Sequence, residues 1–453
     1  NVVQQEHAVK DNQLLRDLIR EKISSLFHLY RYQYHPKDLQ KYIEDFLLPS
    51  FVYYYYKGSV KDFGLFLNSI TDKDERFLPV FKRVNNLLYS IQNEGNGSDI
   101  RILGDIHSNG STKYLINNKI RYQQYPYYND IINNVLSIFL DNYKQYFPKI
   151  SKDNFGNIVR EYVDIDEKTD SESVVREYYH NLGKFIPGLL LLRSIDINAE
   201  NMIIHLPYPI FFDMETVLSG EFDEAYSNYD IKNTGVVKVI DDIDSSLLSG
   251  GLKKNKSYLK PIIIGDINSP RIVWKVKSKG KYHNIPILNG KKALASNYVN
   301  DLMRGYKESY EKILLKKDDI LNVVLPDNNF IRVIFRPTRV YRVITLESCY
   351  PQVYENSNID DFLEKKLNEY QLIHNVDVKD LLSSELESIN KLEIPVFYCS
   401  VKSRDIISPE GKIAAKFFYS PESYWKEFVS KNINKEFFVN QELILQNSIQ
   451  EIE

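Results

Sequence analysis

The chain has 453 residues, of which 43% are hydrophobic, and a formal net charge of −3 at pH 7. This length and apolar content support a large core, built either from several domains or from one elaborate domain. The near-neutral charge gives no reason to expect nucleic acid or a membrane surface as a partner, and the longest apolar run is too short to span a bilayer.

The chain carries two cysteines, Cys349 and Cys399. Two cysteines cannot form a disulfide framework, and no Cys/His cluster has the spacing of a zinc site. The sequence starts at Asn1, and no signal peptide opens it. We therefore expect a cytoplasmic protein without a structural metal.

Residues 1–95 are predicted to form a helical region, because apolar residues recur there at helical spacing. After residue 96 the pattern changes to short alternating segments separated by Gly and Asn turns. These predict a small antiparallel sheet over about residues 96–126. The sheet would carry a loop that contains Gly and Ser, an element able to close over phosphates.

Asp105 and His107 lie in this loop, within the sequence GDIHSNG. They are two residues apart, so on a strand they would face the same side. The same residues also fit a turn Asp and a hydrogen-bonded structural His. The loop by itself leaves both interpretations open.

Helical spacing returns from Tyr127 through Phe147, and a strand is predicted over residues 160–165. A long helix is then predicted from Glu172 to Leu192. Its apolar residues fall on one side, as expected for a helix that packs on a core: Val175, Tyr178, Tyr179, Leu182 and Phe185. This helix leads directly into a polar loop.

The stretch from Arg193 to Thr216 reads as that polar loop followed by a hairpin with an acidic end. Its strands are predicted over Met202 to His205 and Ile210 to Phe212, with a turn that contains two prolines. Polar residues in this order, at the end of a buried hairpin, make the stretch the first place to look for chemistry.

Asp196 stands five residues before Asn201, and Asp213 follows after the hairpin. Protein kinases use this order, with one Asp accepting the hydroxyl proton and the Asn and later Asp holding Mg²⁺ at the nucleotide phosphates. Mg²⁺ takes such oxygen ligands. Glu215 would lie on the same edge as Asp213, because residues two apart in a strand share a face. An ordinary hairpin with acidic, solvated ends fits the same spacing, since short motifs also occur by chance.

Residues 219–257 are polar and irregular, and such long loops are typical of lids, activation segments or disorder. The acidic run at 241–244 is more typical of a solvated face than of a metal site. Two strands follow, over 259–264 and 271–277, and then a long helix from Ala293 to Lys316.

The segment from Phe330 to Pro351 contains Arg332, Arg336 and Arg339, with Thr338 among them. Arginine grips phosphate at two points, and a Thr hydroxyl adds a third contact. Alternatively, these arginines pair with surface carboxylates, an arrangement that contributes little to stability.

Helices at 358–372 and 378–392, a strand over 394–399 and a mixed tail complete the chain. The sequence shows no internal repeat.

Four motifs in order resemble the dehydratase domain of the class II lanthipeptide synthetases, the LanM family. GDIHSNG resembles the family loop Gly-Asp-x-His-x-x-Gly, and EYYHNLGKFIPGLLLLRSIDINAENMI resembles its tyrosine-rich helix running into Thr-Asp-x-His-x-Glu-Asn. YPIFFDMET is similar to Tyr-Pro-x-x-x-Asp-x-Glu-Thr, and RVIFRPTRVY to Arg-x-x-x-Arg-Pro-Thr-x-x-Tyr. EIPVFY is similar to the Asp-Ile-Pro-x-Phe that follows.

The resemblance implies an α+β fold, a lipid-kinase-like bilobal domain elaborated with many helices. It covers residues 96–410 as the kinase-like dehydratase core, with the small lobe at about 96–126 and 219–257 as a segment like an activation loop or lid. Residues 1–95 would be an N-terminal helical region, and 411–453 a C-terminal tail. The family's zinc-dependent cyclase domain has no counterpart in this sequence, so we expect no ring formation by that route.

The resemblance also implies a two-stage reaction on Ser and Thr of a ribosomal precursor peptide. ATP and Mg²⁺ would serve phosphorylation, and elimination of phosphate would leave dehydroalanine or dehydrobutyrine. Asp196 would position or deprotonate the hydroxyl, Asn201 and Asp213 would hold Mg²⁺, and Glu215 would support them. The residues of the elimination step would be Arg332 and Thr338 on the phosphate, with Asp105 and His107 handling protons.

Two positions depart from the family pattern. The family lysine that contacts ATP phosphates is missing from the run Tyr122 to Pro126, where Lys113 or Lys119 would have to substitute. Asn198, counted here with the nucleotide-binding residues, replaces the family histidine. The alternatives are a phospho-Ser/Thr lyase or kinase-like partner of another protein, or a catalytically silent peptide-binding scaffold. A separate cyclase is a further expected partner.

Overall fold

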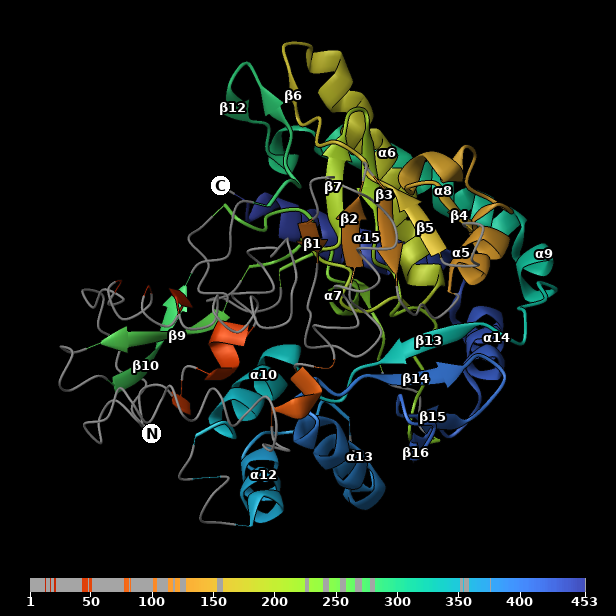
Figure 1. Cartoon of the computed structure of the whole chain (residues 1–453). Helices are drawn as coiled ribbons and strands as arrows, with labels where there is room; N and C mark the ends of the chain where they lie inside the picture. Colours follow the sequence, from red (N-terminus) through yellow and green to blue (C-terminus); the bar gives the residue numbers. More distant parts are fainter. Residues whose placement is uncertain are drawn as a thin grey trace.

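The computed structural model describes residues 128–452 apart from short gaps, three strands between residues 101 and 122, and a few helical residues before residue 83. The gaps lie at 153–157, 225–227, 239–243, 253–257, 265–270, 278–281, 351–352, 354–357 and 375. Most of the predicted helical region at 1–95 therefore falls outside the described residues. The described part combines helices with several small sheets, so the predicted α+β class is confirmed (Figure 1).

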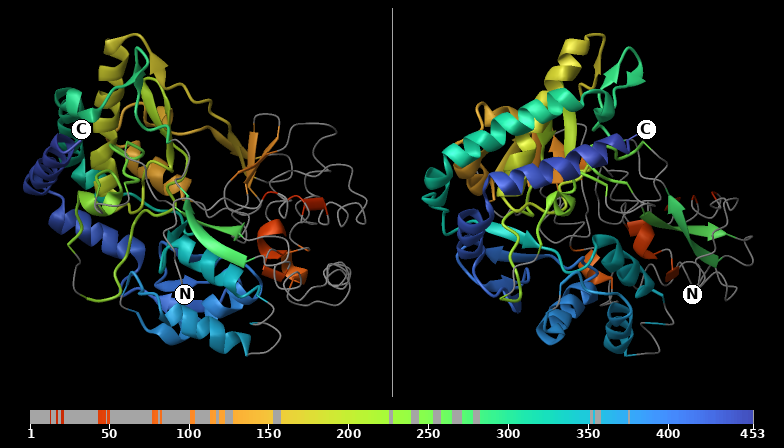
Figure 2. Two further views of the ribbon diagram at one scale, coloured as in Figure 1. Left: turned by 90° about the vertical axis from the view of Figure 1, so that its left-hand side faces the viewer. Right: turned by 180° about the vertical axis from the view of Figure 1, so that it is seen from behind.

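Helix α6 (Glu172–Leu191) packs along α8 (Val299–Leu315) (Figure 2). All five apolar residues predicted to share one side of α6 are buried. The helices meet at two glycines. A Cβ on Gly183 would lie 2.0 Å from the Leu302 carbonyl oxygen, and a Cβ on Gly305 would lie 2.0 Å from that of His180. Only residues without a side chain allow this approach.

The predicted hairpin forms. Its first strand is β7 (Met202–His205), as expected, whereas β8 (Tyr208–Phe211) begins two residues earlier and ends one residue earlier than predicted. Met202 and Ile204 alternate with more exposed residues and face the core. The ring of Phe211 stacks on Phe185 of α6 with centroids 4.1 Å apart. The hairpin is thereby fixed to the helix that precedes it in the chain.

A five-stranded antiparallel sheet has the order β1-β2-β3-β5-β4. Its first three strands confirm the small sheet predicted near residues 96–126, whereas the GDIHSNG loop lies outside the described residues. The predicted helix from Tyr127 to Phe147 is instead two short elements, α5 and η1. The bounds are β1 Arg101–Leu103, β2 Lys113–Ile116, β3 Lys119–Tyr122, α5 Asn129–Leu136, η1 Tyr143–Tyr146, β4 Ile150–Lys152 and β5 Ile158–Glu161.

A second antiparallel sheet has the order β13-β14-β15-β16, and three helices lie beside it (Figure 1). A separate apolar cluster, which includes Tyr341, Leu363 and Ile389, holds these helices together. The bounds are β13 Phe330–Val333, α10 Thr338–Glu347, α12 Ile359–Asn368, α13 Val378–Asn390, β14 Phe397–Ser400, β15 Asp405–Ile407 and β16 Ile413–Lys416.

The C-terminal residues, expected as a mixed tail, supply β16 and two helices, α14 (Pro421–Asn432) and α15 (Lys435–Gln450). Trp425 is fully buried, and its indole nitrogen donates to the Leu191 carbonyl at 2.8 Å, at the end of α6. The C-terminal helices therefore support the segment that leads into the Asp196 loop.

The remaining described elements are short helices and sheets around this core. The predicted helix from Ala293 begins later, at Val299, because the chain first forms the short turn η2. Both strands predicted after residue 257 are confirmed as the pair β9 and β10. The bounds are β6 Lys168–Thr169, α7 Ile231–Thr234, β9 Tyr258–Ile264, β10 Arg271–Lys277, β11 Ile287–Leu288, β12 Lys291–Lys292, η2 Ala295–Asn297 and α9 Lys317–Leu321.

Candidate active site

The loop between α6 and β7 is held by backbone hydrogen bonds at every second residue. The amide of Ile195 donates to Thr216 at 2.9 Å, that of Ile197 to Thr234 at 2.8 Å, and that of Ala199 to Ser245 at 2.8 Å. Three separate segments thus fix one short loop. The backbone amides of the residues between these anchors, Asp196 among them, take no part in these three hydrogen bonds.

Asp196 has a φ of +56°, a conformation that Asp adopts more readily than most residues. Such conformations cluster at functional sites. The amide nitrogen of Asn198 donates to the Asp196 carboxylate at 3.1 Å. Asp196 is exposed, yet desolvation by the surrounding protein raises its pKa to about 6, against the opposing effect of Arg332. Glu200 and Asp213 contribute further to the increase.

Asn201 connects this loop to the hairpin end. Its side-chain nitrogen donates to the Asp196 carbonyl at 2.8 Å, and its own carbonyl accepts from the Phe212 amide at 3.1 Å. These bonds place Asn201 beside the residue that precedes Asp213. Because the amide nitrogen is engaged, the amide oxygen is the atom that Asn201 has left for a ligand.

Glu215 and Arg332 connect the two predicted residue sets. The Glu215 carbonyl accepts from the Arg332 amide at 2.8 Å, and the Glu215 carboxylate forms an ion pair with the guanidinium. Burial by itself would lower the pKa of Arg332, but Glu215, together with Tyr398 and Asp213, raises it. Asp213 lies within electrostatic reach of the same guanidinium. Glu215, predicted beside the nucleotide, thus holds the arginine predicted for phosphate.

Thr338 is the first residue of α10, and it lines a small cavity of about 10 Å³ together with Arg332. The structure therefore brings the two residues of the predicted phosphate clamp to one place. Helix N-termini favour anions, because their amide groups lack partners within the helix.

Arg336 also lines this cavity, but its guanidinium is engaged by other groups of the protein. It is 2% exposed and faces the fully buried Glu385, with Nε at 2.7 Å from the carboxylate. It also donates to the carbonyls of Leu367 and Tyr370. Of the two interpretations left open for these arginines, pairing with a carboxylate holds for Arg336, although that carboxylate is buried and not at the surface.

Asp105 and His107 lie outside the described residues. Lys113 and Lys119 fall on β2 and β3, but the structure describes only their backbone. The expected proton-handling pair and the substitute for the missing lysine therefore remain predictions.

The donor set fits a Mg²⁺ ion. Asn201 offers an amide oxygen and Asp213 a carboxylate, and Mg²⁺ commonly takes one or two protein oxygens together with water and phosphate. Within the described part of the chain, no group of three or more His, Cys, Asp or Glu residues could hold a metal by itself.

The described parts of the segment 219–257 pack against the Asp196 loop. Val236 and Leu247 are fully buried, and a Cβ on Gly235, where φ is +93°, would lie 2.7 Å from the Ile197 carbonyl oxygen. Asp244 is 8% exposed and accepts from the hydroxyls of Ser246 at 2.7 Å and Ser249 at 2.6 Å. The prediction of a solvated acidic face is therefore wrong at Asp244.

Two tyrosines near the site were not predicted. Tyr398 of β14 pairs with Arg332 across the sheet, and Tyr282 donates to Glu200 at 3.2 Å. In FYCS the more apolar residues Phe397 and Cys399 alternate with Tyr398 and Ser400, which indicates a shared face for Tyr398 but not its neighbour on the next strand. Nothing in the sequence indicated the position of Tyr282.

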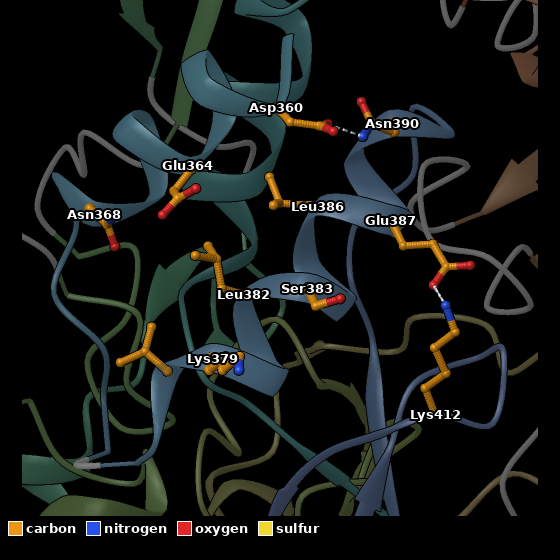
Figure 3. Close-up of a pocket in the computed structure, with 11 residues that line it drawn as sticks. Asp360, Glu364, Asn368, Lys379, Leu382, Ser383, Leu386, Glu387, Asn390 and Lys412 are labelled. Atoms are coloured by element: carbon orange, nitrogen blue, oxygen red, sulfur yellow. Dashed lines mark hydrogen bonds and ion pairs between the residues drawn. The ribbon is translucent and has the colours of Figure 1, made fainter. Parts of the chain in front are cut away.

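A groove of about 810 Å³ lies between α12 and α13, away from these residues (Figure 3). Leu382 and Leu386 of α13 line it, and its polar edge includes Asp360, which accepts from Asn390 at 2.6 Å. None of the predicted site residues lines this groove.

Among the described residues, no helix is long and apolar enough to cross a membrane. Cys349 and Cys399 are free and buried.

The fold and site define an α+β protein with an Asp/Asn/Asp loop and hairpin beside an Arg/Thr pair. A domain of unknown function (DUF4135) matches residues 128–400, and the chain belongs to this family. The matched range includes the Asp196 loop, the hairpin, Arg332 and Thr338.

The chain is also similar to the lacticin 481/lactococcin biosynthesis protein LcnDR2 of Lactococcus lactis subsp. lactis. The two are 26% identical over 405 residues, which are 81% of this chain and 42% of LcnDR2. Together with the family match, this confirms the resemblance to the LanM family. The chain spans less than half the length of this curated relative.

Proposed function

We propose that the protein dehydrates Ser and Thr residues of a ribosomally made precursor peptide, in a lipid-kinase-like domain with two lobes. The observation that carries the proposal is the contact of Glu215 with Arg332, which joins the residue sets expected for phosphorylation and for elimination. Membership of the family supports it, as does the similarity to a protein named for lacticin 481 biosynthesis.

The first step is phosphoryl transfer. The substrate hydroxyl oxygen bonds to the γ-phosphorus of ATP, the bond from that phosphorus to the ADP oxygen breaks, and the hydroxyl proton passes to Asp196. A carboxylate whose pKa is raised to about 6 is a better proton acceptor than an ordinary Asp. Asn201 and Asp213 would hold Mg²⁺, which neutralises phosphate charge when bound.

The second step is elimination. The proton on the α-carbon is removed, a double bond forms between the α- and β-carbons, and the bond from the β-carbon to oxygen breaks as phosphate leaves with the electron pair. Arg332 and Thr338 bind this departing phosphate and stabilise its growing charge. Asp105 and His107 are the candidates for the proton transfers.

A narrower function is favoured by the two departures in the sequence. The missing lysine and Asn198 both affect the nucleotide side of the site, and loss of a cation beside the transferred phosphoryl slows that step. On this alternative the protein is a phospho-Ser/Thr lyase or a kinase-like partner of another enzyme. A peptide-binding scaffold without turnover is the limiting case.

Incubation of the protein with a candidate precursor peptide, ATP and Mg²⁺, followed by mass spectrometry, distinguishes these functions. Loss of one water per modified residue supports complete dehydration, and gain of phosphate supports an isolated kinase step. A pre-phosphorylated peptide tests elimination separately. No mass change in either assay would contradict both enzymatic proposals and leave the scaffold.

A further inference from the structure

Tyr398 lies directly opposite Arg332 in the antiparallel pair of β13 and β14. The two neighbouring pairs, Ile331 with Cys399 and Val333 with Phe397, are buried. Side chains alternate between the two faces of a strand, so Arg332 and Tyr398 share the other, more open face. Directly opposed residues in such a pair have Cβ atoms roughly 5 Å apart, which puts the phenol beside the guanidinium.

Arg332 has donors to spare. Its Nη1 group is engaged by Glu215, and no other described residue accepts from the remaining guanidinium N–H groups. The pairing with Glu215 therefore fixes the orientation of the guanidinium while leaving an edge available to a second anion. Two-point recognition of phosphate by arginine uses such an edge.

The Tyr398 hydroxyl is available in the same way, because no described residue forms a hydrogen bond with it. Tyr398 is partly exposed, as is Arg332 on the same face of the sheet. Desolvation raises the pKa of Tyr398, and nearby Glu215 raises it further. The phenol therefore stays protonated at neutral pH and acts as a hydrogen-bond donor.

We propose that the Tyr398 hydroxyl donates a hydrogen bond to the phosphate of a phosphorylated Ser or Thr substrate, alongside the guanidinium of Arg332. This inference rests on the proposed function and adds a substrate-contacting residue to it. A neutral donor suits this position, since Glu215 and Asp213 already balance the positive charge of Arg332. The ligand class is a phosphomonoester on a peptide.

The kinetic test uses a synthetic peptide with one phosphoserine and measures release of inorganic phosphate. Tyr398→Phe keeps the ring and removes the hydrogen-bond donor. We expect phosphate release to fall on the order of 10²-fold, the usual effect of removing one donor that stabilises a transition state in an enzyme. Phosphorylation of the matching Ser peptide should fall less than phosphate release does. Tyr310→Phe, at a buried tyrosine that stacks on Phe438 in the α8–α15 contact, is the matched control.

A second measurement separates this inference from the proposed function. Binding of the phosphoserine peptide is compared with binding of the Ser peptide, without turnover, in the wild-type chain and in Tyr398→Phe. We expect preference for the phosphorylated peptide in the wild type and about a tenfold weaker preference in the variant.

The outcomes are distinct. If the wild type binds phosphoserine selectively through Tyr398 but releases no phosphate, the proposed function fails and the inference stands. Equal binding of both peptides by the wild type, or equal behaviour of Tyr398→Phe and wild type in both assays, would overturn the inference. An equal loss of both reaction steps in Tyr398→Phe would show a structural role and overturn it as well.

Discussion

Arg332 and Arg336 lie four residues apart in one segment and both pair with a glutamate, but their surroundings differ. The pair of Arg336 and Glu385 is 2% and 0% exposed, and further carbonyls take up the remaining donors. Arg332 and Glu215 are 22% and 15% exposed, and part of the guanidinium has no described partner. A buried arginine with all its donors satisfied supports the fold, whereas a partly exposed one with donors to spare is suited to a ligand.

The largest expected effect is on folding, from Arg336→Ala. This change leaves Glu385 buried without its positively charged partner, and breaking such a pair costs about 3–5 kcal/mol. Urea denaturation of the variant measures the free energy of unfolding. Arg339→Ala, at an exposed arginine of the same segment, is the control and should change stability by less than about 0.5 kcal/mol.

The double variant Arg336→Met with Glu385→Leu sharpens this result. Replacing both members of a buried ion pair by apolar residues is often neutral, so most of the lost stability should return. A double variant as unstable as Arg336→Ala would show that the hydrogen bonds to Leu367 and Tyr370 matter more than the ion pair.

Arg332→Ala should instead act on the reaction. We expect phosphate release from a phosphopeptide to fall on the order of 10²–10³-fold, so phosphorylated peptide accumulates in the presence of ATP. The loss of stability should be smaller than in Arg336→Ala, because water reaches Glu215. Mass spectrometry measures the modification of the peptide. Full dehydration by this variant would contradict the role of Arg332 as the phosphate clamp.

Thr338→Val removes a hydroxyl with almost no change in shape and should have a smaller effect. One hydrogen bond to a charged phosphate corresponds to about a tenfold slower release. The rate of phosphate release is compared with that of Arg332→Ala on the same phosphopeptide. The ratio shows how much the guanidinium and how much the Thr338 hydroxyl contribute to phosphate release. An unchanged rate would remove Thr338 from the site.

The smallest expected effect is on the pH dependence of stability and comes from His374. Its ring lies against those of Phe222 and Phe335, and Phe335 stands between Arg332 and Arg336 in the sequence. Burial lowers the pKa of His374 below its ordinary value of 6.5, although Glu221 opposes this. The folded chain therefore binds the proton less readily than the unfolded chain, and stability is lost as pH falls below about 6.5. His374→Phe should flatten that part of the curve of unfolding free energy against pH.

The local elements near the site could be predicted because their patterns are short and complete. The hairpin around Pro207 consists of two short apolar runs on either side of a turn with prolines, and the apolar side of α6 shows helical spacing over five residues. The start of α8 was misplaced because the apolar residues from Ala293 onward fit a helix equally well, while the chain uses them in a turn.

The partners of charged residues could not be predicted in this way. Arg336 finds Glu385, 49 positions later, and Arg332 finds Glu215, 117 positions earlier. Both arginines stand in one motif, and no local pattern distinguishes them. The position of Tyr398 opposite Arg332 could not be predicted either, because it depends on the register of β13 against β14.

Helices α6 and α8 cross at a short distance that only glycine permits at the two contact positions. A methyl group at Gly183 or Gly305 would overlap a carbonyl oxygen of the opposite helix and act as a wedge between the two axes. Since α6 ends two residues before Arg193, such a wedge would tilt the base of the Asp196 loop relative to the hairpin. The two glycines thus set the spacing between α6 and α8, and through it the position of the loop that carries Asp196.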